Sequence, residues 1–254
     1  MSAPVLVADE GPVRLITINR PQARNAVDLA VAEGIEQALD AYEEAPSLRA
    51  AVITGAGGTF CAGMDLKGFL RGERPSTARS GFAGLVERPP SKPLIAAVEG
   101  YALAGGFEIV LACDLIVAAE SAVFALPEVQ RGLVAAGGAL LRLQHRLPYH
   151  LAMELAITGR RLSAADAAAH GLLNRLVPEG GAVASALELA RAVAANGPLA
   201  VSASKKIMTE SAHWPPEQAF DRQREISEPV RASEDAREGA RAFTEKRAPV
   251  WQGR

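Results

Sequence analysis

The residues that could do chemistry in this chain are led by two glutamates, Glu108 and Glu128, which share one Gly-rich region. Glu108 follows residues 105–107 (GGF) and opens the apolar run 109–113, whereas Glu128 comes directly after Pro127. A carboxylate in such surroundings costs several kcal/mol unless it is paired, hydrogen-bonded or protonated. Two of them close together would have their pKa values pushed apart, as a general acid and a general base require. The pair therefore predicts an enzyme.

Two Gly-rich segments, residues 60–66 (FCAGMDL) and 104–108 (AGGFE), each precede an expected helix. The first N–H groups of a helix have no intrahelical partner, and they point outward with the positive end of the helix dipole. Two such ends that converged on one point would form an oxyanion hole from backbone alone. The alternative is that these glycines only make tight turns, which we favour for either segment taken alone. Together with the two glutamates, the segments favour the oxyanion hole.

Familiar nucleotide and metal motifs are incomplete in this sequence. Residues 55–60 (GAGGTF) resemble the start of a dinucleotide-binding fingerprint, but Phe60 stands where the last glycine belongs. The sequence contains neither a GxxxxGK(S/T) phosphate loop nor a GxSxG nucleophile elbow. None of the four histidines has a metal-binding spacing: His145, His150, His170 and His213. We therefore expect no metal site and no nicotinamide, ATP or zinc chemistry.

Composition places the chain among ordinary globular proteins. It has 254 residues, 49% hydrophobic and 22% charged, with a formal net charge of −2. Neither this charge nor the 5% of aromatic residues favours nucleic acid or an anionic membrane as a partner. Cys61 and Cys113 form no disulfide or metal framework, and the N-terminus lacks the features of a signal peptide. No apolar run approaches the roughly 20 residues that span a bilayer, so we expect a soluble cytoplasmic protein with a small substrate.

The elements that must position these groups alternate between strands and helices. We expect short strands at residues 13–19, 50–54, 94–98 and 115–119. A helix should begin after Asn25 with Asp28 as its N-cap, because apolar residues then recur at helical spacing, and a second helix should cover residues 106–112. This alternation predicts an α/β fold with parallel pairing. No tandem repeat is evident.

Residues 71–93 differ from their surroundings because glycine and proline punctuate them. We expect a mobile excursion with a short helix. Such a segment could be a lid or the wall of a pocket, and a plain surface loop is an equal alternative.

Local signals mark one further helix and a strand. Ser163 with Asp166 resembles a capping box, and Gly171 suits the position just after a helix end. Residues 172–177 then read as a short strand.

The C-terminal part of the chain is expected to be helical. The pattern runs from residue 181 to 244 and is interrupted at residues 197–198, 215–216 and Pro229. We place an α/β part that carries the active site at residues 1–196 and a helical region at 197–254. These last helices either pack on the α/β part or reach a neighbouring subunit.

Several motifs together resemble the crotonase (enoyl-CoA hydratase/isomerase) family, over nearly the whole chain. They are FCAGMDL, ALAGGFEIVLACDLIVAAESAVFALPE, TGRRLSAADAAAHGLLNRLV and FTEKRAPVW, with the early Asn19-Arg20-Pro21 and Arg24-Asn25-Ala26. The resemblance implies a spiral of ββα repeats, and a C-terminal helical region that holds trimers together, often paired into hexamers. It also implies an acyl-CoA thioester as substrate, with no cofactor beyond the CoA that the substrate carries.

The resemblance assigns roles to the residues singled out above. Carried over by motif position, the backbone N–H groups of Met64 and Gly105 form the oxyanion hole, and Glu108 and Glu128 are the two hydratase glutamates. Family members that only isomerise double bonds generally keep the second acid and lose the first, so the presence of both favours hydration. By analogy Glu108 helps to activate the water and Glu128 delivers the Cα proton, although the two could share both roles.

The resemblance also implies a set of contacts to the substrate and its CoA. The set is Arg24, Ala62, Gly63, Asp65, Leu66, Phe243 and Lys246. Phe243 and Lys246 would act from a neighbouring subunit. Arg24 and Lys246 could equally be solvated surface charges.

One stretch departs from the family pattern. Where many hydratases have a Thr-Gln pair, this chain has Ala139-Leu140, although Gly137, Gly138 and Arg142 are retained. Because this stretch lies near the second glutamate in the family, the substrate or the favoured reaction could differ. The sequence therefore predicts an enoyl-CoA hydratase. The alternatives are a Δ3,Δ2-enoyl-CoA isomerase, a lyase like carnitinyl-CoA dehydratase, or a non-catalytic acyl-CoA-binding paralogue.

Overall fold

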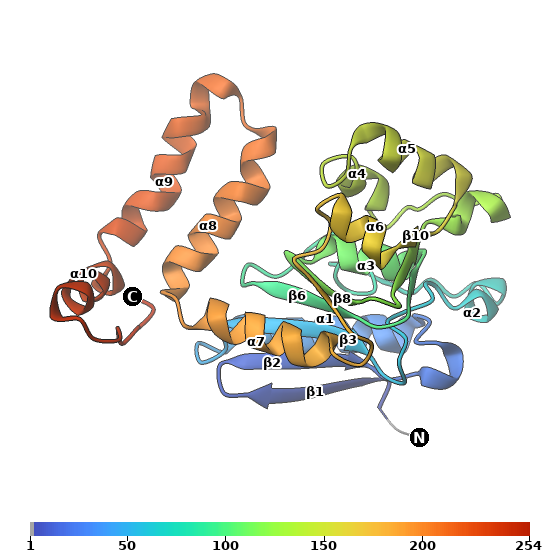
Figure 1. Ribbon diagram of the computed structural model, residues 1–254, viewed down its shortest axis with the longest axis horizontal. Helices are drawn as coiled ribbons and strands as arrows, with labels where there is room; N and C mark the ends of the chain where they lie inside the picture. The colour runs from blue at the N-terminus through green and yellow to red at the C-terminus, as the bar shows by residue number, and fades with distance from the viewer. Residues whose placement is uncertain (1–2) are drawn as a thin grey trace.

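A six-stranded sheet forms the base of the molecule in the computed structural model, which describes residues 3–254 (Figure 1). Its strand order is β1-β2-β3-β6-β8-β11. The first pair is an antiparallel hairpin, and every later pair is parallel. The strands are β1 (Val5–Glu10), β2 (Val13–Ile18), β3 (Ala50–Gly55), β6 (Leu94–Val98), β8 (Leu115–Ala119) and β11 (Arg175–Val177). The expected α/β fold with parallel pairing is therefore confirmed.

Both faces of this sheet are covered, which explains why its central strands are apolar throughout. In β3, Ala50 and Val52 pack on one side with helix α7 (Ala182–Ala194), whereas Ala51 and Ile53 belong to the larger core on the other side. That larger core includes residues of α1 (Leu29–Glu44) and α3 (Gly105–Ala112). Strands buried on both faces lose the alternating pattern of a half-exposed strand.

A second, three-stranded sheet reveals a repeat that the sequence does not show. It contains β7 (Tyr101–Leu103), β9 (Val123–Ala125) and β10 (Leu162–Ser163), and β7 pairs in parallel with β9. In the units β6-β7 and β8-β9, the first strand enters the large sheet and the second enters the small one. Each unit continues into helical turns, namely α3 after β7, and η2 (Pro127–Arg131) with α4 (Ala139–Leu143) after β9. This is the ββα repetition that the resemblance implies.

The segment 71–93 contains no helix, so that part of the prediction was wrong. Helix α2 (Leu66–Leu70) ends just before it, and the segment forms a small hairpin of β4 (Ser76–Thr77) and β5 (Gly81–Phe82). Gly81, Ala83 and Gly84 all have positive φ angles, which a right-handed helix does not accommodate. Much of the segment is buried: Ala83, Leu85 and Val86 join the main core.

The predicted helix caps are present. Asp28 accepts the N–H of Val31 at 3.0 Å and begins α1, and Ser163 accepts the N–H of Asp166 at 3.0 Å. The latter begins α6 (Ala164–Ala169), which follows α5 (Tyr149–Thr158). Gly171 has a φ of +79° after α6, as expected. The strand predicted at residues 172–177 is shorter, because only its last three residues pair with β8.

Helices α8 and α9 project away from the two sheets, as Figure 1 shows, and neither buries a residue. Breaks fall at residues 197–198 and 215–216 as predicted, but Pro229 lies inside α9. A proline so close to the end of a helix removes only one hydrogen bond near its last turn. The remaining elements are η1 (Pro21–Ala23), α8 (Pro198–Glu210), η3 (Ser211–His213), η4 (Pro216–Gln218), α9 (Ala219–Arg231) and α10 (Glu234–Glu245).

The predicted boundary between an α/β part at residues 1–196 and a helical region at 197–254 remains a prediction. Residues 1 and 2 of the first part lie outside the described residues. None of the helices within residues 3–254 combines the length and apolarity needed to cross a membrane.

Candidate active site

Glu108 lies in the first turn of α3, with only 4% of its surface exposed. The N–H of Ala139 donates to its Oε1 at 3.2 Å, and Gly137 lies so close that an added Cβ would be 2.5 Å from Oε2. Burial raises the pKa of Glu108, whereas the N–H groups of Ala139 and Gly137 and the charge of Arg142 oppose the rise. A carboxylate held by backbone donors is favoured in its ionised form.

The stretch that departs from the family pattern contacts the first glutamate, in addition to the expected position near the second. Only the backbone N–H of residue 139 is used, so a change of side chain from Thr to Ala does not remove this contact.

Glu128 has different surroundings in η2. Its Oε2 is buried and has no hydrogen-bond partner among the described residues. Burial raises the pKa of Glu128 to about 6, and the negative charge of Glu108 contributes to the rise. The charge of Glu108 therefore affects the ionisation of Glu128, which is consistent with a pair of carboxyl groups in one site.

The two carboxyl groups differ in what surrounds their oxygens. Two backbone N–H groups favour the carboxylate form of Glu108, and Arg142 adds positive charge. Among the described residues, the buried Oε2 of Glu128 has no partner, and this favours the neutral acid because ionisation would leave a buried charge unpaired. A base and an acid in one site could remove a proton from water and supply a proton to a neighbouring carbon.

The two segments expected to form an oxyanion hole lie side by side. Cys61 pairs with Ala102 as an isolated parallel bridge, which aligns the segment before α2 with the segment before α3. A Cβ added at Gly63 would lie 3.2 Å from the nitrogen of Gly105. Met64 follows Gly63 directly, so the two proposed N–H donors are close in space. Within residues 3–254, no hydrogen bond uses the N–H of Met64 or of Gly105.

Ala104 holds the start of α3 in an unusual conformation. Its φ is +51° and its ψ is −125°, a region that residues with a side chain rarely adopt. The N–H of Ala104 donates to the carbonyl of Ala125 at 2.9 Å, which fixes this residue to β9. The conformation turns the chain sharply from β7 into α3. Its cost, of order 1–3 kcal/mol, is typical of functional sites.

Arg20 holds the N-terminal ends of two helices near the site in place, a role that the sequence did not reveal. One Nη donates to the carbonyl of Ala26 at 2.6 Å and lies 3.2 Å from Asp28, and the other donates to Asp65 at 3.0 Å. Asp28 and Asp65 are the N-caps of α1 and α2. One guanidinium therefore fixes the starting points of both helices. The Asn-Arg-Pro motif was the only signal for it.

Asn25 has a second supporting role that the sequence left unassigned. It is fully buried, and its amide donates to the carbonyls of Ala56 at 2.8 Å and Thr59 at 2.6 Å. Its φ of +56° turns the chain so that the carbonyl of Arg24 accepts the N–H of Ala62 at 3.0 Å. Two residues expected to contact CoA, Arg24 and Ala62, are thus neighbours.

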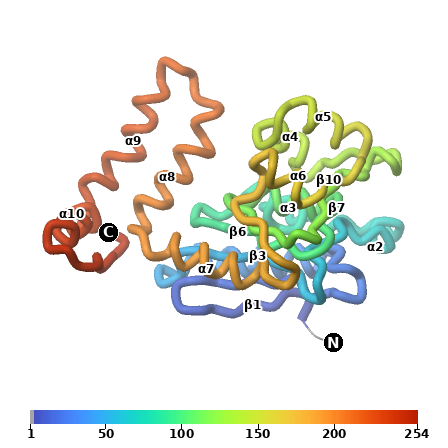
Figure 2. The backbone as a smooth tube through the Cα atoms, in the orientation of Figure 1, coloured from blue at the N-terminus to red at the C-terminus, as the bar shows by residue number. Residues whose placement is uncertain are grey.

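The other expected contact residues fall into two groups. Asp65 is engaged by Arg20 and by its capping bonds to the N–H groups of α2, while Leu66 is 46% exposed beside it. Phe243 and Lys246 belong to the region of α10, which lies at the opposite end of the molecule from α2 (Figure 2). Any contact from these two residues requires a second subunit, and all these binding roles remain predictions.

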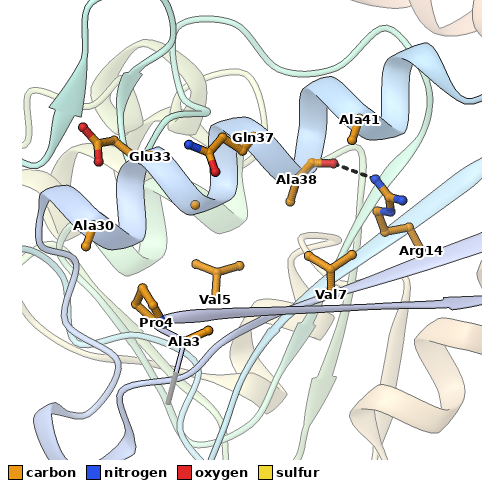
Figure 3. Close-up of a pocket in the computed structure, with 11 residues that line it drawn as sticks. Ala3, Pro4, Val5, Val7, Arg14, Ala30, Glu33, Gln37, Ala38 and Ala41 are labelled. Carbon is orange, nitrogen blue, oxygen red and sulfur yellow. Dashed lines mark hydrogen bonds between the residues drawn. The ribbon is translucent and has the colours of Figure 1, made fainter. Parts of the chain in front are cut away.

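A hollow between β1 and α1 offers no comparable chemistry (Figure 3). Small and apolar side chains dominate its lining, with Glu33 and Gln37 on α1. Arg14, the cation among its described lining residues, donates to Asp9 at 2.8 Å and to the carbonyl of Ala38 at 3.0 Å. No cluster of three or more His, Cys, Asp or Glu suited to a metal ion occurs in the described part of the chain.

Comparisons with known proteins agree with this geometry. A family model described as enoyl-CoA hydratase/isomerase matches residues 9–254. The enoyl-CoA hydratase EchA19 of Mycobacterium tuberculosis is 44% identical, over 98% of this chain and 96% of that protein. The carnitinyl-CoA dehydratase of Salmonella typhi is also 44% identical, over all of both chains. A solved structure, a probable enoyl-CoA hydratase/isomerase from Mycobacterium abscessus, has a TM-score of 0.96 and 58% identity over all of both chains.

Proposed function

Because this chain belongs to the enoyl-CoA hydratase/isomerase family, we propose that it is an enoyl-CoA hydratase that adds water across the α,β double bond of an enoyl-CoA thioester. The observation that carries the proposal is the contrast between the two glutamates. Glu108 has backbone N–H donors, and Glu128 has a buried oxygen that has no partner within residues 3–254. A hydratase needs one group that accepts a proton from water and another that donates a proton to Cα of the same substrate molecule.

The reaction follows from these groups. The thioester oxygen accepts the N–H groups of Met64 and Gly105, which stabilise the negative charge that develops on it. Glu108 takes a proton from water while the water oxygen bonds to Cβ, and Glu128 gives its proton to Cα. The double bond becomes a single bond, and the product is a 3-hydroxyacyl thioester. Each acid–base group typically contributes about 10²–10⁴-fold, and one oxyanion donor about 10²–10³-fold.

Several features of the working enzyme belong to the same proposal. The acyl group arrives as a CoA thioester, and no other cofactor is needed. Arg24, Leu66 and the backbone at residues 62–63 contact the CoA, and Asp65 fixes the start of α2 beside it. Phe243 and Lys246 contribute from a neighbouring subunit of a homotrimer or a dimer of trimers. The enzyme acts in the cytoplasm on acyl-CoA from fatty acids or related acids.

The test is to follow the loss of enoyl absorbance with crotonyl-CoA and longer thioesters, using the parent protein and its Glu108→Ala and Glu128→Ala variants. We expect the parent to hydrate at least one thioester and both variants to lose most of that activity. Unchanged turnover in both variants would overturn the assigned mechanism. Binding of acyl-CoA without turnover in the parent would support the non-catalytic alternative.

A second candidate is the dehydration of a 3-hydroxyacyl thioester such as carnitinyl-CoA. The observation that favours it is the 44% identity to a carnitinyl-CoA dehydratase, equal to the identity with the hydratase relative. The same two glutamates would serve, because elimination of water is the reverse of addition. The ratio of kcat/KM for carnitinyl-CoA and for 3-hydroxybutyryl-CoA separates the two candidates.

A further inference from the structure

The ring of Phe82 touches Gly105, the residue whose N–H is assigned to the oxyanion hole. A Cβ added at Gly105 would lie 2.3 Å from Cζ and 2.5 Å from Cε1 of Phe82. Real Cβ atoms do not approach so closely, so the outer edge of the ring occupies the space that a side chain at position 105 would need. Phe82 is only partly buried and packs against the main core. The ring therefore covers the start of α3 from the side of the segment 71–93.

Phe82 is held in place by its neighbours in the chain. Gly81 and Ala83, on either side of it, both have positive φ angles, of +70° and +56°. The N–H of Ala83 donates to the carbonyl of Pro75 at 3.0 Å. The hydroxyl of Thr77 donates to Glu36 on α1 at 2.8 Å, which ties the hairpin to that helix. These contacts hold the ring of Phe82 against Gly105, although the segment contains no helix and only short strands.

The same segment also contacts Arg142, a residue close to Glu108. The carbonyl of Val86 accepts Nη2 of Arg142 at 2.5 Å, and Arg142 lies near enough to Glu108 for their charges to interact. Gly105 and Glu108 are three residues apart in α3, so they face the same side of the helix. Residues 82–86 therefore contact both Gly105, at the proposed oxyanion hole, and Arg142, beside the proposed base Glu108.

We propose that Phe82 is a specificity-determining residue that restricts the site to enoyl thioesters without a branch at Cα. The inference rests on the proposed function, which places the thioester carbonyl at Gly105 and Cβ at Glu108. Cα then lies between these two points, alongside the edge of the ring. A methyl group on Cα competes with the ring for the same space, whereas lengthening of the chain beyond Cβ does not.

The experiment compares crotonyl-CoA with 2-methylcrotonyl-CoA in the parent protein, Phe82→Leu and Phe82→Ala. We expect the ratio of kcat/KM for the branched over the unbranched thioester to rise by about 10–200-fold in Phe82→Ala, the range typical of one methyl-sized difference in an apolar pocket. Phe82→Leu should give a smaller rise in the same direction. Thr77→Val is the matched control, because it loosens the hairpin without changing the ring, and its ratio should equal that of the parent.

Two outcomes would overturn the inference. One is an unchanged ratio in both Phe82 variants while their circular dichroism melts show folded protein. The other is a ratio that rises equally in Thr77→Val, which would assign the effect to the hairpin as a whole. A parallel measurement of Kd for butyryl-CoA and 2-methylbutyryl-CoA, by calorimetry, does not require turnover. If the parent hydrates neither thioester, the proposed function fails, and the ratio of these Kd values still decides the role of Phe82.

Discussion

Glu108 and Glu128 are set in two differently built regions of the molecule. Glu108 lies within a regular helix and receives hydrogen bonds from residues that follow Glu128 in the sequence. Glu128 lies in a short 3₁₀ turn, and its buried Oε2 has no partner within residues 3–254. Burial raises the pKa of both groups. At Glu108 the N–H groups of Ala139 and Gly137 and the charge of Arg142 oppose the rise. At Glu128 its own N–H and the charge of Arg131 oppose it, whereas the charge of Glu108 adds to it. The buried oxygen of Glu128 is therefore the main difference between the two regions, and it supports the proposal that Glu108 is the base and Glu128 the acid.

The largest expected effect comes from Glu108→Gln. The change removes the proposed base, and the new amide nitrogen would face the N–H of either Ala139 or Gly137, a contact between donors. We expect kcat/KM for crotonyl-CoA to fall by about 10³–10⁴-fold, at the upper end of the usual range for a general base. Steady-state hydration assays measure this loss.

Glu99→Gln is the matched control for that variant. Glu99 is also a buried carboxylate that accepts backbone N–H groups, from Gly180 at 3.1 Å and Ala182 at 2.9 Å, but it caps α7 away from the site. We expect Glu99→Gln to lower the melting temperature and to leave kcat/KM nearly unchanged. Equal activity losses in the two variants would show that Glu108 acts only through stability.

Glu128→Gln should have a smaller effect on the same assay. Glutamine cannot supply the Cα proton, but its amide has the same shape as the neutral acid, and its oxygen can still accept the N–H of residue 128. We expect a loss of about 10²–10³-fold in kcat/KM. A larger loss of kcat/KM in this variant than in Glu108→Gln, with both measured at pH 6, would contradict the assignment of Glu108 as base and Glu128 as acid.

The pH dependence of kcat/KM in the parent protein tests the contrast between Glu108 and Glu128 without any mutation. The reaction needs Glu128 protonated and Glu108 ionised, and kcat/KM reports the groups of the free enzyme. Because the pKa of Glu128 is raised to about 6, kcat/KM for hydration should fall above that pH, by about tenfold per pH unit in the limit. The residual activity of Glu128→Gln should lack this decline. A decline that persists in the variant would assign the pKa to another group.

Short-range signals in the sequence were enough to predict much of the scaffold. Asp28 and Ser163 begin helices as expected, because a cap depends on residues only three positions away. Strands β2, β3, β6 and β8 of the large sheet and the helix that carries Glu108 were also predicted, since each is a compact apolar run bounded by turn residues, whereas the mostly exposed strand β1 was missed. The pair of glutamates was visible because an isolated acid before or after an apolar run is unusual.

Contacts between distant segments could not be predicted in the same way. Phe82 meets Gly105, and Gly137 meets Glu108, only after the ββα units have stacked. The positive φ angles of Ala83 and Ala104 are unfavourable locally, so tertiary contacts must impose them. For the same reason the hairpin at residues 76–82 was mistaken for a region with a short helix.

The smallest expected effect is on stability, and it follows from the unpaired oxygen of Glu128. Its pKa in the folded protein, about 6, is above the ordinary glutamate value of 4.5, so the folded state binds the proton more tightly than the unfolded state does. The contribution of Glu128 to stability is therefore fully present below about pH 4.5 and is lost as the pH rises through about 6. Glu128→Gln should remove this loss.

We expect the melting temperature of Glu128→Gln, relative to the parent, to be higher at pH 8 than at pH 4. Because part of the side chain is open to solvent, the gain should be at most about 2–4 °C, which corresponds to about 1 kcal/mol in a protein of this size. Thermal melts at the two pH values measure it, with Glu120→Gln as a control on an exposed glutamate. A variant that is less stable than the parent at pH 8 would mean that the ionised Glu128 has a stabilising partner. In that case the two glutamates would not differ in the way that assigns one as acid and the other as base.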